Sequence, residues 1–439
     1  MKRREFIKTS AMAAGALTAP FPLFTDQEKV KLAILGTGWW GTDELLANAL
    51  TTGQFEIVAL CDVDSMALDR AAEAVVKAGF TKPLLFADYR EMYEMPGLEA
   101  VAIATPTHWH ALQFIDACRK GLHVFLEKPI SYDIAEGMAM LEAKKKANIV
   151  VQVDFPRTTV DTNKKVKALI HSGEIGKVFQ VQANINRMDA VLVEKTIPDT
   201  MDYETYCGPA PKTRYLCSEQ SMKPNWRGQR EFSRGILMDW GIHYVHNIRQ
   251  ILNLGLPGHV SAVGGITRNL TQQNPDHLNV HFDFDGLPVY WTHKSWGFTS
   301  PVPDYNIGVY YYGEKGTIFA GDLGWDILPA GGEKKVSHGD VRFQPDKSGI
   351  TEIYDNMIVD LFYEFADGIR KHSNDRITNT FEEAVKTTST VIYGDLAYTV
   401  KSGISIDPST MDIRNNGEAQ KMLKREYRAP YQHPYKERV

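Results

Sequence analysis

The chain has 439 residues, enough for about two domains of ordinary size after a short N-terminal segment, so a single small domain is excluded. Hydrophobic residues make up 43% and charged residues 23%, which is typical of soluble globular proteins and excludes disordered, collagen-like and disulfide-scaffold chains. The net charge is −5 and the basic residues are scattered beyond the N-terminus, so we expect no nucleic-acid partner and no anionic membrane.

Residues 1–24 have the order of an export signal: a basic start, a short and weakly apolar stretch, and an exit that contains proline. The paired Arg3 and Arg4 resemble the twin-arginine export motif, which is associated with proteins that fold before they cross the membrane. We therefore expect a periplasmic or otherwise exported protein that can carry a cofactor out with it. No cysteine follows the apolar stretch, so no lipid anchor and no stable membrane anchor is expected.

Short apolar runs alternate with helical segments between residues 29 and 154. The predicted strands are Val30–Leu35, Glu56–Cys61, Ala100–Ala104, His123–Leu126 and Ile149–Val153. The predicted helices are Trp39–Leu50, Ser65–Ala78, His108–Lys120 and Ile134–Ala147. Continuous apolar strands separated by helices indicate a parallel sheet covered on both faces. The sequence therefore predicts a doubly wound α/β domain over residues 29–154.

A glycine motif stands at the first predicted turn from strand to helix. Gly36, Gly38 and Gly41 form a G-x-G-x-x-G pattern, with Trp39 and Trp40 inside it. This pattern is typical of a Rossmann domain, where the glycines allow a tight turn, an approach by pyrophosphate and close packing of helix on strand. Asp62 ends the second strand, where a carboxylate can bind the ribose hydroxyls of NAD and repel the 2′-phosphate of NADP. We therefore expect NAD as the cofactor, and NADP less so.

Two further motifs follow later strands, at the edge where open parallel sheets bind ligands. The first holds Thr105, Pro106, His108 and His110, and the second holds Glu127 and Lys128. We predict that these residues also lie at the cofactor site and that Lys128 donates or accepts a proton there. The two histidines could equally be part of a helix N-terminus without chemistry.

The motifs GTGWWG, ATPTHWH and LEKPI, in this order, resemble the Gfo/Idh/MocA family of NAD(P)-dependent oxidoreductases (glucose-fructose oxidoreductase, inositol dehydrogenase and rhizopine catabolism proteins). The resemblance implies that Lys128 lies near the nicotinamide and the reacting hydroxyl of the substrate. It also implies that Asp239 and His243 of MDWGIH line the active cleft, and that Arg157 lies near both cofactor and substrate. Residues i and i+4 share one helix face, which agrees with Asp239 and His243 acting together. His246 replaces an acid that the family often carries.

The stretch from Met188 to Gly235 is long, loop-like and rich in aromatic residues and arginine. Long loops in compact domains usually carry function, and we expect Tyr206, Trp226 and Arg227 to face a sugar. Cys207 and Cys217 lie near each other in this stretch, but buried free thiols are favoured over a bridge between them. No metal site is predicted, because the thirteen histidines show no ligand spacing with nearby acids that is not already explained.

Residues 155–412 are predicted to form a second α+β domain that carries substrate and subunit contacts, with a C-terminal arm or flexible end over residues 413–439. Alternating polar and apolar residues indicate a large, open and mostly antiparallel sheet. Its predicted strands are Val178–Arg187, His259–Thr267, Asn279–Phe284, Val289–Trp296, Tyr305–Tyr312 and Gly316–Ala320. Helices are expected at Asn356–Lys371 and Glu382–Lys401, the latter packing back on the first domain. The family resemblance implies a homodimer or homotetramer formed through the open face of this sheet.

These patterns favour an exported NAD-dependent oxidoreductase acting on a sugar, sugar acid or glycoside, with Lys128, Asp239 and His243 as catalytic residues. We also expect Lys128, Arg157, Tyr206, Trp226, Arg227, Asp239 and His243 to bind the substrate. An alternative is a redox-neutral glycosidase or lyase in which NAD transiently oxidises C3 of the sugar ring. A third possibility, a binding or sensory protein that retains NAD, conflicts with the intact set of Lys128, Asp239 and His243.

Overall fold

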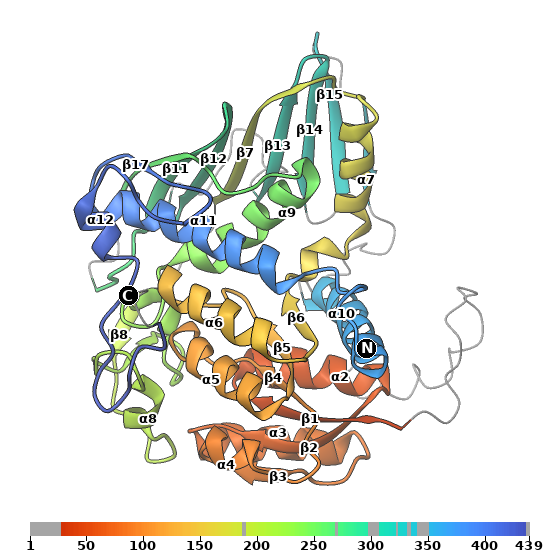
Figure 1. The fold of residues 1–439 in the computed structure, drawn as a ribbon, viewed down its shortest axis with the longest axis vertical. Helices are drawn as coiled ribbons and strands as arrows, with labels where there is room; N and C mark the ends of the chain where they lie inside the picture. The colour runs from red at the N-terminus through yellow and green to blue at the C-terminus, as the bar shows by residue number, and fades with distance from the viewer. Residues whose placement is uncertain are drawn as a thin grey trace.

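The computed structural model describes residues 28–186, 190–267, 271–296, 307–321, 324–331, 335–339 and 351–435. The predicted export signal lies outside these residues, as do Arg187, Met188 and Tyr305 at the ends of predicted segments. The described residues form a six-stranded sheet, a nine-stranded sheet and a two-stranded pair, with helices packed on the two larger sheets (Figure 1). Within the described ranges, no helix combines the length and the apolar composition needed to cross a bilayer.

The first sheet has six strands in the order β3-β2-β1-β4-β5-β6, and all described pairs are parallel. Its strands are β1 Val30–Leu35, β2 Phe55–Cys61, β3 Leu84–Phe86, β4 Ala100–Ile103, β5 His123–Glu127 and β6 Val151–Asp154. The connecting helices are α2 Ala47–Thr52, α3 Ser65–Lys77, α4 Tyr89–Tyr93, α5 Thr107–Lys120 and α6 Ile134–Lys146. This confirms the predicted doubly wound fold, and the short elements β3 and α4 are additions that sequence periodicity did not indicate.

Side chains of β1 alternate between the two faces of this sheet, as the two-residue repeat of a strand requires. Leu32 and Ile34 pack into one apolar cluster with α2, α3 and a helix from far along the chain, whereas Ala33 and Leu35 pack into another with α5 and α6. Both faces are therefore covered, which explains why the strands read as continuous apolar runs.

The distant helix is α10, Thr351–Lys371, which lies beside the first sheet although the second domain precedes it in the chain (Figure 1). The ring of Phe362 stacks on Phe125 with centroids 4.2 Å apart and meets Phe55 edge-on at 5.5 Å. Burial of one such ring contributes about 1.5–3 kcal/mol. The prediction assigned a return to the first domain only to the next helix, so the role of α10 in covering the first sheet is new information from the structure.

The second sheet has nine strands in the order β16-β15-β14-β13-β7-β12-β11-β10-β17, with a parallel pair at β7 and β12 and antiparallel pairs elsewhere. Its strands are β7 Val178–Asn186, β10 His259–Gly265, β11 His277–Phe284, β12 Leu287–Lys294, β13 Ile307–Gly313, β14 Gly316–Gly321, β15 Gly324–Pro329, β16 Lys335–Gly339 and β17 Ile404–Ser405. The helices α7 Asp161–His171, α9 Ile242–Leu252 and α11 Phe381–Thr399 cover one face (Figure 1). The predicted α+β sheet is confirmed, and α11 also packs on α6 of the first domain, as expected.

The stretch that the sequence marked as loops contains a small hairpin, β8 Leu192–Glu194 with β9 Leu216–Ser218, and the short helix α8 Tyr203–Cys207. A separate apolar cluster that includes Tyr206, Tyr215 and Phe232 holds it together. All four cysteines are buried and free, so the interpretation as free thiols is supported and the Cys207–Cys217 bridge is not formed.

Candidate active site

The glycine turn at the end of β1 is shaped by close contacts of the backbone. Gly36 has a φ of +90°, and a Cβ there would lie 2.8 Å from the carbonyl carbon of Ala104. A Cβ on Gly41 would lie 1.8 Å from the Gly36 carbonyl oxygen. A Cβ on Gly38, in contrast, would meet no protein atom within 4 Å, and Gly38 lines the cleft at the end of the sheet. The first two positions require glycine for packing, and the third leaves the room that a pyrophosphate needs.

The carboxylate of Asp62 is held against this turn. The Thr37 amide donates to Oδ2 at 2.6 Å, the Thr37 hydroxyl donates at 3.2 Å, and the Asp64 amide donates to Oδ1 at 3.0 Å. An ionised carboxylate has about four acceptor positions, so it can still accept from ribose hydroxyls. Asp62 also lines the cleft. Its orientation and remaining acceptor capacity fit the adenosine ribose of NAD.

The two arginines on this side of the cleft are already paired with carboxylates. Arg70 lies 3.2 Å from Asp43 and donates to the Gly38 carbonyl at 3.1 Å, and Arg90 donates to Asp88 Oδ1 at 2.9 Å and to Oδ2 at 2.8 and 3.1 Å. A 2′-phosphate would therefore meet Asp62 without a dedicated guanidinium partner, which agrees with NAD rather than NADP.

At the opposite end the cleft is lined by Trp40, Thr105, Pro106, Glu127 and Lys128, all of which the sequence indicated. Trp40 lies on a π-helical turn, Trp40–Leu46, and its indole N–H donates to the Glu127 carboxylate. Trp39, just before the turn, is half exposed on the cleft rim. Burial raises the pKa of Glu127, and the neighbouring Asp154 raises it further. This end of the cleft therefore combines the indole ring of Trp40, the carboxyl group of Glu127 with its raised pKa, and the side chain of Lys128.

Lys128 is joined to the second domain through Asp239. Its ammonium lies 3.0 Å from Asp239 Oδ1 and donates to the Asp239 carbonyl at 2.8 Å. Arg227 approaches the same oxygen with Nε at 2.9 Å. Burial raises the pKa of Asp239, but the charges of Arg227 and Lys128 outweigh burial and hold this pKa well below its ordinary value. The carboxylate is therefore ionised and fixes the position of both cations.

Asp239 lies on a second π-helical turn, Leu237–Gly241, which leads directly into α9. Such turns insert extra backbone into a helix and are frequent at functional sites. His243 follows in the first turn of α9, is buried, and meets Phe155 edge-on. Burial lowers the pKa of His243 far below its ordinary value, and the charges of Lys128 and Arg157 lower it further. The imidazole is thus neutral, and its Nδ1 has no hydrogen-bond partner within the part of the chain that the structure describes.

Four predicted site residues, His108, His110, Arg157 and His243, are buried behind the cleft wall, so the expectation that His243 lines the cleft is not met. His108 Nε2 lies 2.9 Å from the Tyr206 carbonyl, and the two ring nitrogens of His110 lie 2.8 and 2.7 Å from the carbonyls of Pro129 and Thr105. Arg157 is buried between the rings of Trp240 and Tyr244, at 5.1 and 5.3 Å. Because the ring nitrogens of His110 contact the segments that follow β4 and β5, His110 fixes the positions of both cleft motifs relative to each other.

The remaining predicted contacts come from the stretch between the domains. Tyr206, Trp226 and Arg227 all line the cofactor cleft, and the guanidinium of Arg227 lies 4.3 Å from the Trp226 ring centroid. Arg227 also borders a second cavity, which is lined by Asp239 together with Leu192, Trp240 and Gln272. Gln272 and Leu192 belong to distant segments with no sequence motif, which explains why the sequence did not indicate them.

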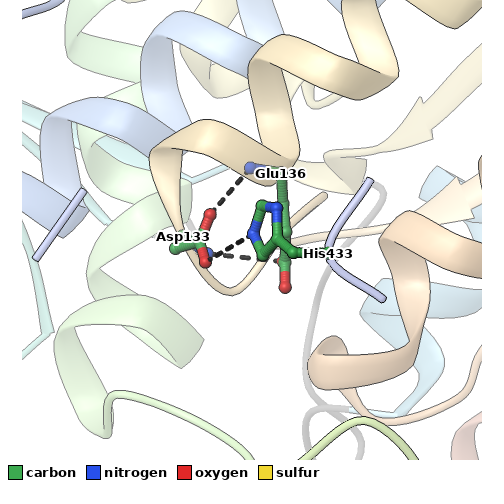
Figure 2. A group of neighbouring side chains, drawn as sticks. All are labelled: Asp133, Glu136 and His433. Atoms are coloured by element: carbon green, nitrogen blue, oxygen red, sulfur yellow. Dashed lines mark hydrogen bonds and ion pairs between the residues drawn. The ribbon is translucent and has the colours of Figure 1, made fainter. Parts of the chain in front are cut away.

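A separate acidic cluster lies at the start of α6, where Asp133 and Glu136 form a reciprocal N-terminal capping box. His433 of the C-terminal arm lies 3.2 Å from Asp133, and ligand atoms of all three side chains are close enough for a metal ion (Figure 2). Arg425 occupies this cluster, with Nη2 2.8 Å from Glu136 and its backbone amide donating to Asp133 at 2.9 Å. The cluster therefore fastens the arm to the first domain. His433 lies 300 residues from Asp133, so sequence spacing could not have revealed it.

Comparison with known families identifies the two halves of this architecture. The model described as "Oxidoreductase family, NAD-binding Rossmann fold" (GFO_IDH_MocA) matches residues 30–155, and the model of the GFO/IDH/MocA C-terminal domain matches residues 209–319. Together they cover more than half of the chain. The chain belongs to the Gfo/Idh/MocA family. Its first domain is accordingly an NAD-binding Rossmann domain, as Gly36, Gly38, Gly41 and Asp62 indicated.

Relatives within the family have different activities. A glycosyl hydrolase family 109 protein of Stenotrophomonas maltophilia is 39% identical over 134 residues, which cover 29% of each chain. The myo-inositol 2-dehydrogenase of Thermotoga maritima is 30% identical over 149 residues, or 34% of this chain and 42% of that protein. The matched segments thus span less than half of these curated relatives. Levoglucosan dehydrogenase, solved with NADH and levoglucosan, has the same fold, with a TM-score of 0.65 and 19% identity over 86% of this chain and 99% of that one.

Proposed function

We propose that the protein is an NAD-dependent oxidoreductase that moves a hydride between the nicotinamide and a hydroxyl-bearing carbon of a sugar, sugar acid or glycoside. The observation that carries this proposal is the contact between Lys128 and Asp239, 3.0 Å apart where the cofactor cleft adjoins the second cavity. A substrate held there lies between the cofactor and a fixed proton-transfer group. Sugar-type dehydrogenases among the relatives support a carbohydrate substrate.

The chain's own residues supply the proton chemistry of this reaction. In the direction of reduction, the Lys128 ammonium donates a proton to the carbonyl oxygen of the substrate; in the direction of oxidation, Lys128 Nζ or the neutral imidazole of His243 accepts the hydroxyl proton. Asp239 holds Lys128 in position through a charge-assisted hydrogen bond. NAD, when bound, supplies the hydride acceptor. Trp40, Thr105, Pro106 and Glu127 would hold its nicotinamide end, and Asp62 its adenosine ribose.

The test has two stages. The purified protein is first analysed by absorbance and mass spectrometry for bound nicotinamide, and its affinity for added NAD is measured. It is then incubated with sugars, sugar acids and polyols, and NADH formation or consumption is recorded. The proposal would be contradicted if the purified protein contained no nicotinamide and had no affinity for NAD. It would also be contradicted if the protein bound NAD but none of the carbohydrates tested caused formation or consumption of NADH.

A redox-neutral glycosidase is the second candidate, because the 39% identical relative is a glycosyl hydrolase family 109 protein. In this scheme the sugar ring is oxidised transiently at C3, which makes the proton at C2 acidic, so that this proton is removed and the protonated leaving group departs from C1. Water then adds at C1 as a proton returns to C2, and the hydride finally returns to C3. The same Lys128 and Asp239 would serve the first step. Release of reducing sugar from a glycoside without net NADH would favour this alternative, whereas stoichiometric NADH would exclude it.

We further propose that residues 1–24 direct export of the folded protein with its cofactor bound. We also propose that copies of the protein associate through the open face of the nine-stranded sheet. Scarcity of free NAD outside the cytoplasm supports a cofactor that is retained and recycled. Replacing Arg3 and Arg4 by lysine is expected to leave the protein in the cytoplasm, which fractionation would detect. Light scattering would report the oligomeric state, and a monomer would contradict the proposed association.

A further inference from the structure

The second cavity, which shares Arg227 with the cofactor cleft and is lined by Asp239, is a built site for polar groups. Its wall is contributed by the β8–β9 hairpin, the π-helical turn that carries Asp239, and the loop 271–276 that leads into β11. Arg227 and Asp239 provide opposite charges, Trp240 provides an aromatic surface, and Leu192 and Ile236 are apolar. Mixed aromatic and polar walls suit a ring that carries hydroxyl groups.

The loop 271–276 is fastened on both sides of Gln272. The Thr271 hydroxyl donates to the Leu192 carbonyl at 2.8 Å. The Gln273 side chain accepts from the Arg230 amide at 2.9 Å and donates to Glu231 at 3.2 Å. Asn274 donates to the carbonyls of Arg227 and Ser233 at 3.1 and 3.3 Å. The polar neighbours of Gln272 are therefore committed to the protein, and they fix its place.

Gln272 itself differs from these neighbours. Its side chain is only 6% exposed and lines the cavity, and none of the side-chain hydrogen bonds among the described residues involves it. An amide that opens into a cavity in this way can bind a polar group of a ligand without giving up a bond to the protein. The side-chain amide offers one acceptor oxygen and two donor hydrogens, a combination that matches a hydroxyl group, which both donates and accepts.

We infer that Gln272 is a specificity-determining residue that binds a hydroxyl group of the carbohydrate, on the part of the substrate that extends past Asp239 away from the nicotinamide. This inference rests on the proposed function, because it takes the second cavity as the substrate side of the site. Asn274 supports it indirectly, since it holds the backbone of Arg227 and so aligns the opposite wall. Gln272 does not touch the reacting carbon and selects among substrates without taking part in proton transfer.

The experiment measures binding apart from turnover. NAD-loaded protein is titrated with myo-inositol, levoglucosan, D-glucose and D-gluconate, with tryptophan fluorescence and calorimetry as readouts. The variants are Gln272→Leu, which removes donors and acceptor, and Gln272→Glu, which keeps the size and removes the donors. The matched control is Gln220→Leu, the same substitution at an exposed position after β9 that does not line the cavity.

For a probe that the wild type binds, Gln272→Leu is expected to raise Kd and KM about three- to tenfold, the loss typical of one hydrogen bond, with kcat and NAD affinity unchanged. It is also expected to lose the preference for that probe over its deoxy analogue, whereas Gln220→Leu keeps this preference. If Gln272→Leu unfolds at a lower temperature than the control, the carbohydrate affinity of Gln272→Glu is used instead. This variant conserves the shape of the side chain and should weaken carbohydrate binding in the same way.

The inference would be overturned if the Gln272 variants and the wild type had equal affinity for the probe and equal preference for it over its deoxy analogue. Parallel loss of NAD affinity and carbohydrate affinity would also overturn it. So would a wild type that binds none of the probes. Failure of the proposed function has a different signature. If the proposed function were wrong but the inference right, the wild type would bind a carbohydrate in a manner that depends on Gln272 but would transfer no hydride to or from it.

Discussion

At the glycine turn of the cofactor cleft, contacts form within the turn itself and with the end of the next strand, whereas in the second cavity the lining residues come from distant segments. Thr37 and Asp62, 25 residues apart, contact each other at the ends of neighbouring strands, and Gly36 and Gly41 touch within one turn. In the second cavity Leu192, Arg227, Asp239 and Gln272 come from four separate stretches. The difference teaches that a motif can specify a cofactor site through its own backbone, while a substrate cavity depends on how loops from elsewhere are held in place.

Lys128→Met tests the residue at which the two regions meet. Methionine retains the length of the side chain but cannot transfer a proton, so turnover is expected to fall about 10²- to 10⁴-fold. Asp239 keeps Arg227 as a partner at 2.9 Å, so the buried carboxylate stays paired and the protein should fold. Steady-state kinetics and NAD titration check this expectation. Undiminished turnover would remove Lys128 from the mechanism.

Asp395→Asn tests whether the substrate side depends on long-range ties. Asp395 of α11 pairs with Arg230 at 2.5 Å and with Arg234 at 2.6 Å, in the stretch that precedes Asp239. Loss of this buried charge should lower the free energy of unfolding by about 3–5 kcal/mol, because two guanidinium groups lose their counter-charge. Carbohydrate binding should weaken more than NAD binding. The control Glu73→Gln, from an exposed pair with Lys77, should leave unfolding by urea nearly unchanged.

The same carboxylate predicts a pH dependence. Burial raises the pKa of Asp395, but Arg230 and Arg234 outweigh burial and hold this pKa below its ordinary value of about 4. A lowered pKa in the folded state contributes stability that is present above the unfolded-state pKa and is lost as the pH falls through the folded-state pKa. Wild-type stability should therefore decline below about pH 4 more steeply than that of Asp395→Asn. Parallel declines would contradict this assignment.

The glycine turn tests whether the cofactor side is specified by its own backbone. In Gly41→Ala the new Cβ would lie 1.8 Å from the Gly36 carbonyl oxygen, and the resulting overpacking should cost about 1–3 kcal/mol of stability. In Gly38→Ala the Cβ meets no protein atom within 4 Å, so stability should stay within about 0.5 kcal/mol while NAD binding weakens. Thermal unfolding and NAD titration separate the two effects. Equal losses of stability in both variants would contradict the division of roles.

His243 provides the smallest expected signal. Since burial and the charges of Lys128 and Arg157 lower its pKa far below its ordinary value, the imidazole should stay neutral as the pH falls through the ordinary histidine midpoint of about 6.5. Nitrogen-15 NMR of histidine-labelled protein can follow this ring, with His243→Asn used to assign its resonance. A midpoint near 6.5 would show that the ring is more solvated than its packing indicates.

The sequence by itself determined the strands and helices of the first domain other than β3 and α4, and the glycine turn with Asp62, while Lys128, Asp239 and His243 were chosen with the help of the family resemblance. The strands, the helices and the turn are local features: apolar periodicity reports burial of a strand or helix, and a motif within one turn dictates its own backbone geometry. Only the tertiary structure decided that α10 covers the first sheet, that Arg227 shares Asp239 with Lys128, and that Gln272 lines the second cavity. These contacts join residues from distant parts of the chain, and pairings of that kind depend on how whole elements pack, which no local pattern records.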